Sequence, residues 1–262
     1  MATKPAAKSA ALKAAPTKPS TSVAVKKPSS SALVSIKEQM ARDLAALAEK
    51  TAPASGNKIQ CSQDKIFTLP NGTKTAGPID LVIVDFCTQH TLYPGAFDKN
   101  NIVPPICFAI GSNPTAMIPS KNSPELQSDA CGACPMNQYE SAAVGKGKAC
   151  KNSRKLAVLP PDASADDPIW ILEVSPTALK GFDSFVASVA RQFVVPPYGV
   201  IVSVGFNPNE TYGSLVFTDP RPNENLEVAY SRRAEAADLL KAEPDVSGYV
   251  PLVKKPMPSR RK

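Results

Sequence analysis

The spacing of apolar residues along this chain predicts many short strands and three helices. The first helix is expected within residues 33–52, where apolar side chains recur on one face while the charged residues fall largely elsewhere. The residues of this apolar face are Ile36, Met40, Leu44 and Leu47. Such an amphipathic helix could dock on the body of the protein or on a neighbouring copy.

Seven apolar runs bounded by turn residues have the length of strands. They lie at 65–69, 79–87, 104–111, 155–159, 168–174, 199–206 and 213–218. The run at 79–87 is the strongest of them, because four apolar residues in a row stand between Asp80 and Asp85. These strands are expected to form the core of the fold.

The two remaining helices follow from capping and periodicity. Ser175 is a suitable N-cap and Pro176 a suitable first helical residue. An apolar stripe then follows at helical spacing: Leu179, Phe182, Val186, Val189 and Phe193. The last helix is expected at about Asn225–Lys241. Trp170, Phe182 and Phe185 fit these patterns and are predicted to be buried.

About seven strands with a mid-chain helix predict a mostly β, α+β fold, specifically a compact, mostly antiparallel, OB-like barrel. A helix that caps a five-stranded core suits the OB-fold, which binds single strands of nucleic acid. About 40 residues between Ser112 and Ser153 show no clear period. A loop of that length in a compact domain is usually functional or held by a metal, so we interpret it as an insertion between two barrel strands.

The basic residues are concentrated at the two ends of the chain. Residues 1–50 carry nine Lys/Arg and three acids, and residues 251–262 carry five Lys/Arg and no acid. Residues 1–30, built almost wholly from Ala, Lys, Pro, Ser and Thr, are expected to be disordered. Basic tails favour a polyanionic partner, most often nucleic acid, although a merely solubilising tail has the same composition.

The predicted organisation therefore has four parts. They are a disordered tail at 1–32, an amphipathic helix at 33–52, an OB-like core at 53–243 with a cysteine-containing loop at 107–153, and a basic tail at 244–262.

Four of the six cysteines have the spacing of a zinc site. Cys131 and Cys134 form a Cys-x-x-Cys pair with small residues between them, which is how a knuckle presents two thiolates to a tetrahedral zinc ion. Cys107 and Cys150 would complete a structural site with one zinc per chain. The fourth ligand stays open between Cys107, Cys87 and His90. Cys61 and Cys87 are otherwise expected to be ordinary buried residues.

Other cysteine chemistries fit the sequence less well. A redox dithiol lies where a strand enters a helix, whereas this pair is followed by Pro135 in a loop rich in Ser, Asn and Pro. Disulfides are not needed to stabilise a core in a chain of 262 residues. An iron–sulfur cluster is a further alternative.

The candidate nucleic-acid contacts surround these cysteines. Five cations flank Cys150, and no acid occurs between Ser141 and Pro161. The cations are Lys146, Lys148, Lys151, Arg154 and Lys155. Three aromatic residues, Tyr93, Phe97 and Tyr139, lie in polar loops and are candidates for base stacking. The alternatives are a solvated lysine cluster and aromatic residues buried in the core.

Several motifs resemble those of phage-encoded single-stranded DNA-binding proteins that have a zinc site in an OB-like fold. The motifs lie at 71–72, 83–86, 93–98, 104–109, 131–137 and 145–152. The resemblance covers about residues 56–218. It implies a role in phage DNA replication or recombination, together with proteins of those processes, and zinc ligands at Cys107, Cys131, Cys134 and Cys150. The chain departs from that family in its basic C-terminal tail, since the family usually ends in an acidic tail that recruits partners.

An enzyme is not expected. The single histidine does not allow a histidine-based triad, and a four-cysteine site has no open position for water. No apolar run is long enough to span a membrane and no targeting segment is evident, so an intracellular location, the host cytoplasm for a phage protein, is expected. Single-stranded DNA binding is the leading hypothesis. The alternatives are a protein that compacts or packages duplex DNA, and a virion or replication scaffold in which zinc only holds a loop.

Overall fold

The computed structural model describes residues 56–95 and 101–251, together with Ile36, Gln39, Met40 and Arg42. Two units are separated in the chain, residues 1–52 and 53–262. In the first unit the four described residues are helical and exposed, and the rest of the predicted amphipathic helix lies outside the described residues. The predicted tail at 1–32 and most of the one at 244–262 also lie outside them.

The described part of the second unit is built on a nine-stranded, curled, mixed sheet. Its strands are β1 (Lys58–Cys61), β2 (Phe67–Thr68), β3 (Lys74–Thr75), β4 (Ile79–Leu92), β5 (Cys107–Gly111), β6 (Lys151–Leu159), β7 (Trp170–Val174), β8 (Val200–Phe206) and β9 (Leu215–Pro222). The strand order is β3-β2-β1-β7-β6-β4-β8-β9, and β5 pairs with β4. The β1–β7 pair is parallel.

Six helical segments accompany the sheet in the described residues. They are the 3₁₀ turns η1 (Pro135–Asn137), η2 (Pro176–Ala178) and η3 (Pro197–Gly199) and the helices α2 (Leu179–Gln192), α3 (Leu226–Ser231) and α4 (Arg233–Leu240). None of them is long and apolar enough to cross a membrane.

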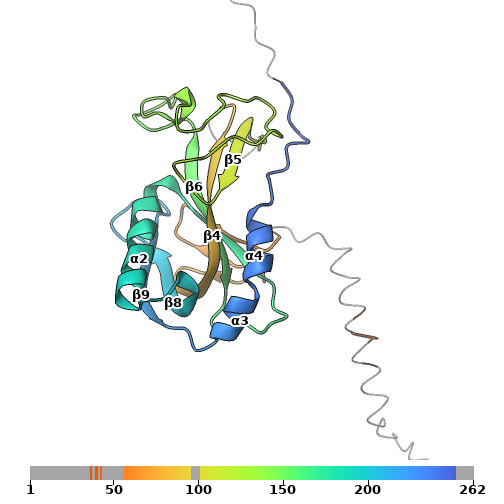
Figure 1. The fold of residues 1–262 in the computed structure, drawn as a ribbon, viewed down its shortest axis with the longest axis vertical. Coiled ribbons are helices and arrows are strands. Elements are labelled where there is room, and N and C mark those ends of the chain that lie inside the picture. The colour runs from red at the N-terminus through yellow and green to blue at the C-terminus, as the bar shows by residue number, and fades with distance from the viewer. Residues whose placement is uncertain (1–35, 37–38, 41, 43–55, 96–100, 252–262) are drawn as a thin grey trace, which may run out of the picture. The chain divides into compact units, whose positions relative to one another are not determined.

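The helices cover both faces of the sheet, as alternate residues of β6 show. Leu156 and Val158 belong to the cluster that contains Phe182 and Val189 of α2. Ala157 and Leu159 belong to a second cluster, with Ala236 and Leu240 of α4. Figure 1 shows α2 and α4 on opposite sides of the sheet. Because both faces are covered there, the last four residues of β6, Leu156–Leu159, are a continuous apolar run rather than an alternating one.

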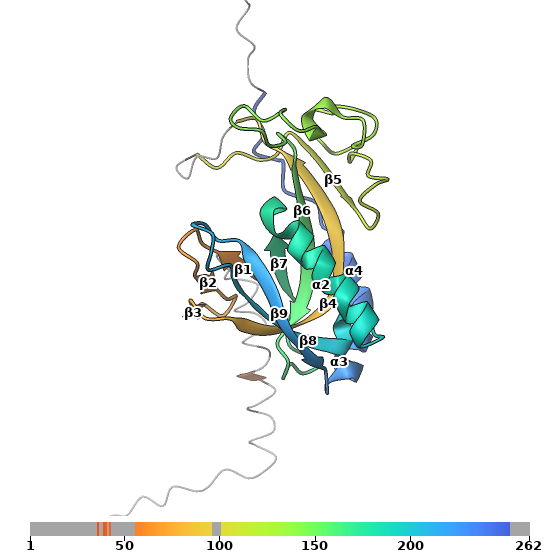
Figure 2. The same cartoon turned by 90° about the vertical axis from the view of Figure 1, so that its left-hand side faces the viewer.

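Strand β4 connects the two ends of the sheet. Its first residues pair with β8 on one side, from Ile79 to Val82, and its last residues pair with β5 on that side, from Thr88 to Leu92. On its other side it pairs with β6 almost throughout, with a β-bulge between Ile83 and Asp85. The loop from β5 to β6 is gathered at the far end of β4 (Figures 1 and 2).

Most of the predicted elements are confirmed, with changed bounds. All seven strands and the helix after Pro176 occur, although β4 extends five residues beyond Cys87. The single predicted last helix is divided in two at Arg232, whose side chain donates hydrogen bonds to the carbonyls of Ala165 and Asp167. Strands β1 and β3 were not predicted.

The mostly β, α+β class is confirmed, and every strand pair among the described residues is antiparallel except β1–β7. The identification as an OB-fold stays a prediction. Burial is as predicted for Phe182 and Phe185, and Trp170 packs partly buried against the same cluster. Cys87 is buried as expected, whereas Cys61 is exposed at the end of a short strand.

Loops rather than strand pairing bring the two ends of the curl together. The rings of Phe67 and Phe206 stack with centroids 4.2 Å apart, and the Lys65 ammonium donates to the carbonyl of Asn207. Gly213 lies so close to the β1–β2 turn that a Cβ atom there would stand 2.5 Å from the carbonyl oxygen of Ser62. Only glycine therefore fits at this closure.

We expect Gly213→Ala to lower the free energy of unfolding by about 1–3 kcal/mol, because the added methyl group meets backbone that must shift. Gly181→Ala on α2 is the matched control, since a Cβ there meets nothing within 4 Å and alanine favours a helix. Urea unfolding of both variants measures the difference. Equal stability of the two would show that the ends of the curl are not in close contact.

Candidate functional site

The ends of β4, β5 and β6 form a three-stranded platform under the long loop. Leu92 pairs with Cys107, and His90 pairs with Ala109 on one side and Asn152 on the other. Directly paired residues project to the same face of a sheet. Cys150 directly precedes β6, in line with the same face. We call residues 112–150, with the strand ends they pack on, the cysteine lobe.

The Cys-x-x-Cys segment forms a tight turn above this platform. The N–H of Cys134 donates to the carbonyl of Cys131 (3.4 Å), and the N–H of Asn137 donates to the carbonyl of Cys134 (3.0 Å) as η1 begins. The buried Asn137 side chain donates to the carbonyl of Cys131 at 2.8 Å. The N–H of Cys150 donates to the carbonyl of Met136 (2.8 Å), which ties the third cysteine to the same turn.

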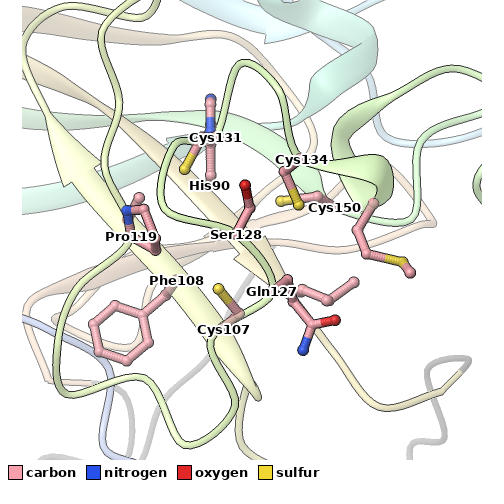
Figure 3. Close-up of a pocket in the computed structure, with 12 residues that line it drawn as sticks. His90, Cys107, Phe108, Pro119, Gln127, Ser128, Cys131, Cys134 and Cys150 are labelled. Carbon is pink, nitrogen blue, oxygen red and sulfur yellow. The ribbon is translucent and has the colours of Figure 1, made fainter.

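These contacts bring four cysteines around one small cavity of about 20 Å³. Its lining includes the thiols of Cys107, Cys131, Cys134 and Cys150, together with His90 and Ser128. In Figure 3 the four sulfur atoms lie around a common central space. All four cysteines are free thiols. A space of this size holds one water molecule or one ion.

The cysteines also influence one another electrostatically. Burial first, and then the neighbouring Cys107 and Cys134, raise the pKa of Cys131 to about 11. Burial and the other three cysteines raise the pKa of Cys150 to about 12, opposed by a hydrogen bond from the backbone of Thr91. These thiols therefore stay protonated at neutral pH when no cation is near. A divalent cation in the cavity would favour the thiolates and release protons.

The donor set fits zinc better than the other common metals. Four sulfur donors with no carboxylate among the named lining residues suit zinc or an iron–sulfur cluster, and a cavity of one-atom size suits a single ion. Within the described residues, however, no group of three or more His, Cys, Asp or Glu side chains has the arrangement of a formed metal site. Zinc binding would thus require the four thiols to move closer together.

The two alternative ligands lie in different places. Cys87 belongs to the cluster under α4, and its thiol points to the carbonyl of Leu240 (3.6 Å), so it is outside the cavity. His90 is buried and lines the cavity, and its Nδ1 atom has no hydrogen-bond partner. Burial, with Lys148 and Arg154 nearby, lowers the pKa of His90 to about 4. It is therefore neutral and remains an alternative donor.

The five candidate cations separate into free and engaged side chains. Arg154 is buried and forms an ion pair with Asp183 of α2 at 3.2 Å. Lys155 donates to the carbonyls of Leu239 and Ala242 and thereby caps the end of α4. Both side chains thus have structural partners within the protein, and their contact with nucleic acid stays a prediction.

Lys146 and Lys151 are exposed and have no ion-pair partner among the described residues. They lie on different surfaces. Lys151 pairs with Thr91, one position from the His90–Asn152 pair, and so projects to the face opposite the cavity. Lys146 lies in the turn of the cysteine lobe, where its carbonyl accepts a hydrogen bond from Glu140.

The aromatic candidates are similarly divided. Tyr139 is 78% exposed in the cysteine lobe, with the Lys148 ammonium 5.1 Å from its ring centroid. Tyr93 is 45% exposed, and its pKa is raised by burial and by Glu173. Glu173 forms an ion pair with Lys58 at 2.8 Å. Phe97 lies outside the described residues. The structure therefore groups Tyr139 with Lys146 and Lys148, and does not group Tyr93 with them.

The roles of Asn137 and of the segment after α4 were not predicted from the sequence. Asn137 links the knuckle to the rest of the lobe, and a polar residue three positions after Cys134 was the available signal. The Glu243 carboxylate accepts hydrogen bonds from Ser120 and Asn122, each at 2.6 Å, and Tyr249 bonds to Glu125. No sequence signal indicates these contacts, because their partners lie more than 100 residues apart.

Comparison with known proteins gave no match to a family model, a curated protein or a solved structure. The assignment of the site therefore depends on its own residues and their geometry.

A zinc site formed by these four thiols predicts about one zinc per chain in metal analysis of the purified protein. Cys131→Ser and Cys134→Ser should each lose the metal, because a hydroxyl is a poor replacement for a thiolate. Cys61→Ser is the control, since Cys61 is exposed on β1 and is not part of the cavity. Full zinc content in the double variant of Cys131 and Cys134 would contradict the assignment.

Proposed function

We propose that this protein binds single-stranded DNA without sequence specificity, and that a structural zinc ion orders the surface that does so. The observation that carries the proposal is Tyr139, an aromatic ring that is 78% exposed, in the same turn as Lys146, which has no ion-pair partner in the part of the chain that the structure describes. Exposed aromatic rings beside cations suit a single strand, because its bases are free to stack while its phosphates are neutralised.

The fold supports this proposal. A mostly β fold with a curled sheet and a few helices, α2 on one face and α4 on the other, is compatible with an OB-like α+β fold, which commonly binds single strands. The basic ends of the chain would add attraction that is independent of sequence. We further propose a role in phage DNA replication or recombination, on the resemblance of the motifs described above.

Zinc would act in this proposal as a structural ion. Four thiolates fill a tetrahedral coordination sphere and leave no site for a reacting water molecule, so we propose a binding protein rather than an enzyme. The residues that would hold the ion are Cys107, Cys131, Cys134 and Cys150. By fixing both ends of the lobe, the ion would reduce the entropy lost when Tyr139 and Lys146 bind a strand.

Lys146→Gln should weaken the binding of single-stranded oligonucleotides of every sequence. It should also reduce the slope of log K against log salt concentration by about 0.7, the value for one phosphate contact on a single strand. Lys151→Gln tests whether the bound DNA strand continues around the end of β6 to the face of the sheet opposite the cavity. Lys74→Gln on β3 is the control, since Lys74 is exposed but lies outside the cysteine lobe. An unchanged slope for Lys146→Gln would show that this turn faces away from the DNA.

Tyr139→Ala should cost about 1–3 kcal/mol of single-strand binding free energy, because one stacked base loses its platform. Duplex binding should barely change. Tyr230→Ala is the matched control, since Tyr230 is 62% exposed but lies on α3. Fluorescence titration with single-stranded and duplex oligonucleotides measures both affinities. Equal losses for the two DNA forms would favour a tail-driven protein that compacts duplex DNA, and absence of binding would favour a scaffold.

A further inference from the structure

The ammonium group of Lys148 is turned inward, unlike that of Lys146 two residues earlier. Its Nζ atom lies 5.1 Å from the centroid of the Tyr139 ring and donates to the Oδ1 atom of Asn137 at 3.4 Å. Lys148 is partly buried, whereas Lys146 is exposed. A cation over an aromatic face is attracted to the electrons of that face. One face of the Tyr139 ring is therefore taken by Lys148.

The backbone of the turn fixes this arrangement. The N–H groups of Glu140 and Ala142 donate to the carbonyls of Lys146 and Gly147, each at 3.2 Å, so the chain folds back and returns Lys148 to Tyr139. Glu140 has a φ of 69°, a left-handed conformation that a residue with a side chain adopts at a cost. The turn thus holds a strained residue directly next to an exposed aromatic ring.

Asn137 connects this pair to the knuckle. Its Oδ1 atom accepts from Lys148, while its Nδ2 atom donates to the carbonyl of Cys131 at 2.8 Å. Asn137 is buried, its hydrogen bond to Cys131 is buried with it, and the hydrogen bond from Lys148 is partly buried. Asn137 thereby links the side chain of Lys148 to the cysteine segment.

We propose that Lys148 is a positioning residue for Tyr139 and not a phosphate contact: it covers one face of the ring, so that the open face takes a single unpaired nucleobase. The inference deepens the proposed single-strand binding and depends on it. It assigns different tasks to two lysines that the sequence alone makes equivalent. Lys146 neutralises the strand, and Lys148 holds the platform on which a base stacks.

The test compares Lys148→Met with Lys146→Met, since methionine removes the charge of either lysine and keeps an apolar stem. Each variant is titrated with a single-stranded oligonucleotide and with an abasic strand of the same length, at several salt concentrations. Lys148→Met should weaken binding of the base-bearing strand about two- to fivefold, the value of an exposed cation–π contact, and leave the abasic strand and the salt slope unchanged. Lys146→Met should weaken both strands equally and reduce the slope by about 0.7.

Two further variants complete the experiment. Lys148→Arg should restore base-dependent binding, because a guanidinium group also stacks on an aromatic face. In the Tyr139→Ala background, Lys148→Met should have no effect, because no ring remains to be positioned.

The inference is overturned if Lys148→Met behaves as Lys146→Met does, or if it changes neither strand while Tyr139→Ala weakens binding. A different result marks failure of the proposed function itself. In that case the unaltered protein does not prefer single strands, or Tyr139→Ala has no effect on them.

Discussion

The pairing of β4 with β6 is the constraint on which the rest of this structure depends. The two strands run side by side through both halves of the molecule, from the sandwich between α2 and α4 to the cysteine lobe. In the first half both faces of the pair are buried under helices. In the second half, the cavity is lined by Leu92 of β4, which pairs with Cys107, and by Cys150, which directly precedes β6. The cysteine lobe is thus aligned on the β4–β6 pair, which is stabilised by the two apolar clusters under α2 and α4.

The lobe itself has little apolar material with which to fold. Its own buried cluster consists of Ala109, Met117 and Cys131, in contrast to the two larger clusters on either side of the sheet. Its order comes from hydrogen bonds to β5, such as those between Ser123 and Phe108, and from the contacts of Glu243 and Tyr249 after α4. A segment with so small a core is of the kind for which a metal cross-link contributes most to folding. The small apolar core of the lobe is thus a reason to expect a metal ion that is independent of the cysteine spacing.

The spacing of neighbouring residues predicted those elements that form through interactions between neighbours in the sequence. The apolar run in β4, the apolar stripe of α2 and the turn between Cys131 and Cys134 all follow from neighbours in the sequence, although the predicted cap Ser175 makes no capping hydrogen bond. The extension of β4 to Leu92 does not, because its polar residues become strand only through pairing with β5 and β6. The five cations were predicted to act as a group. In the structure, however, Arg154 forms an ion pair with Asp183, and Lys155 donates a hydrogen bond to the end of α4. Distant partners of this kind determine which charges remain free, and one sequence does not reveal them.

The bulge between Ile83 and Asp85 has a consequence for the whole lobe. Before it, odd-numbered residues such as Leu81 and Ile83 face the cluster under α2, and after it the even-numbered Phe86 does so. One additional residue in β4 thus exchanges the faces to which all later residues of that strand project. Without that shift in phase, Gln89 and Thr91 would project toward the thiols, and His90 would lie on the side of α4. The face of the sheet on which His90 meets the four thiols is therefore set by a bulge in β4 that precedes all four of these cysteines in the chain.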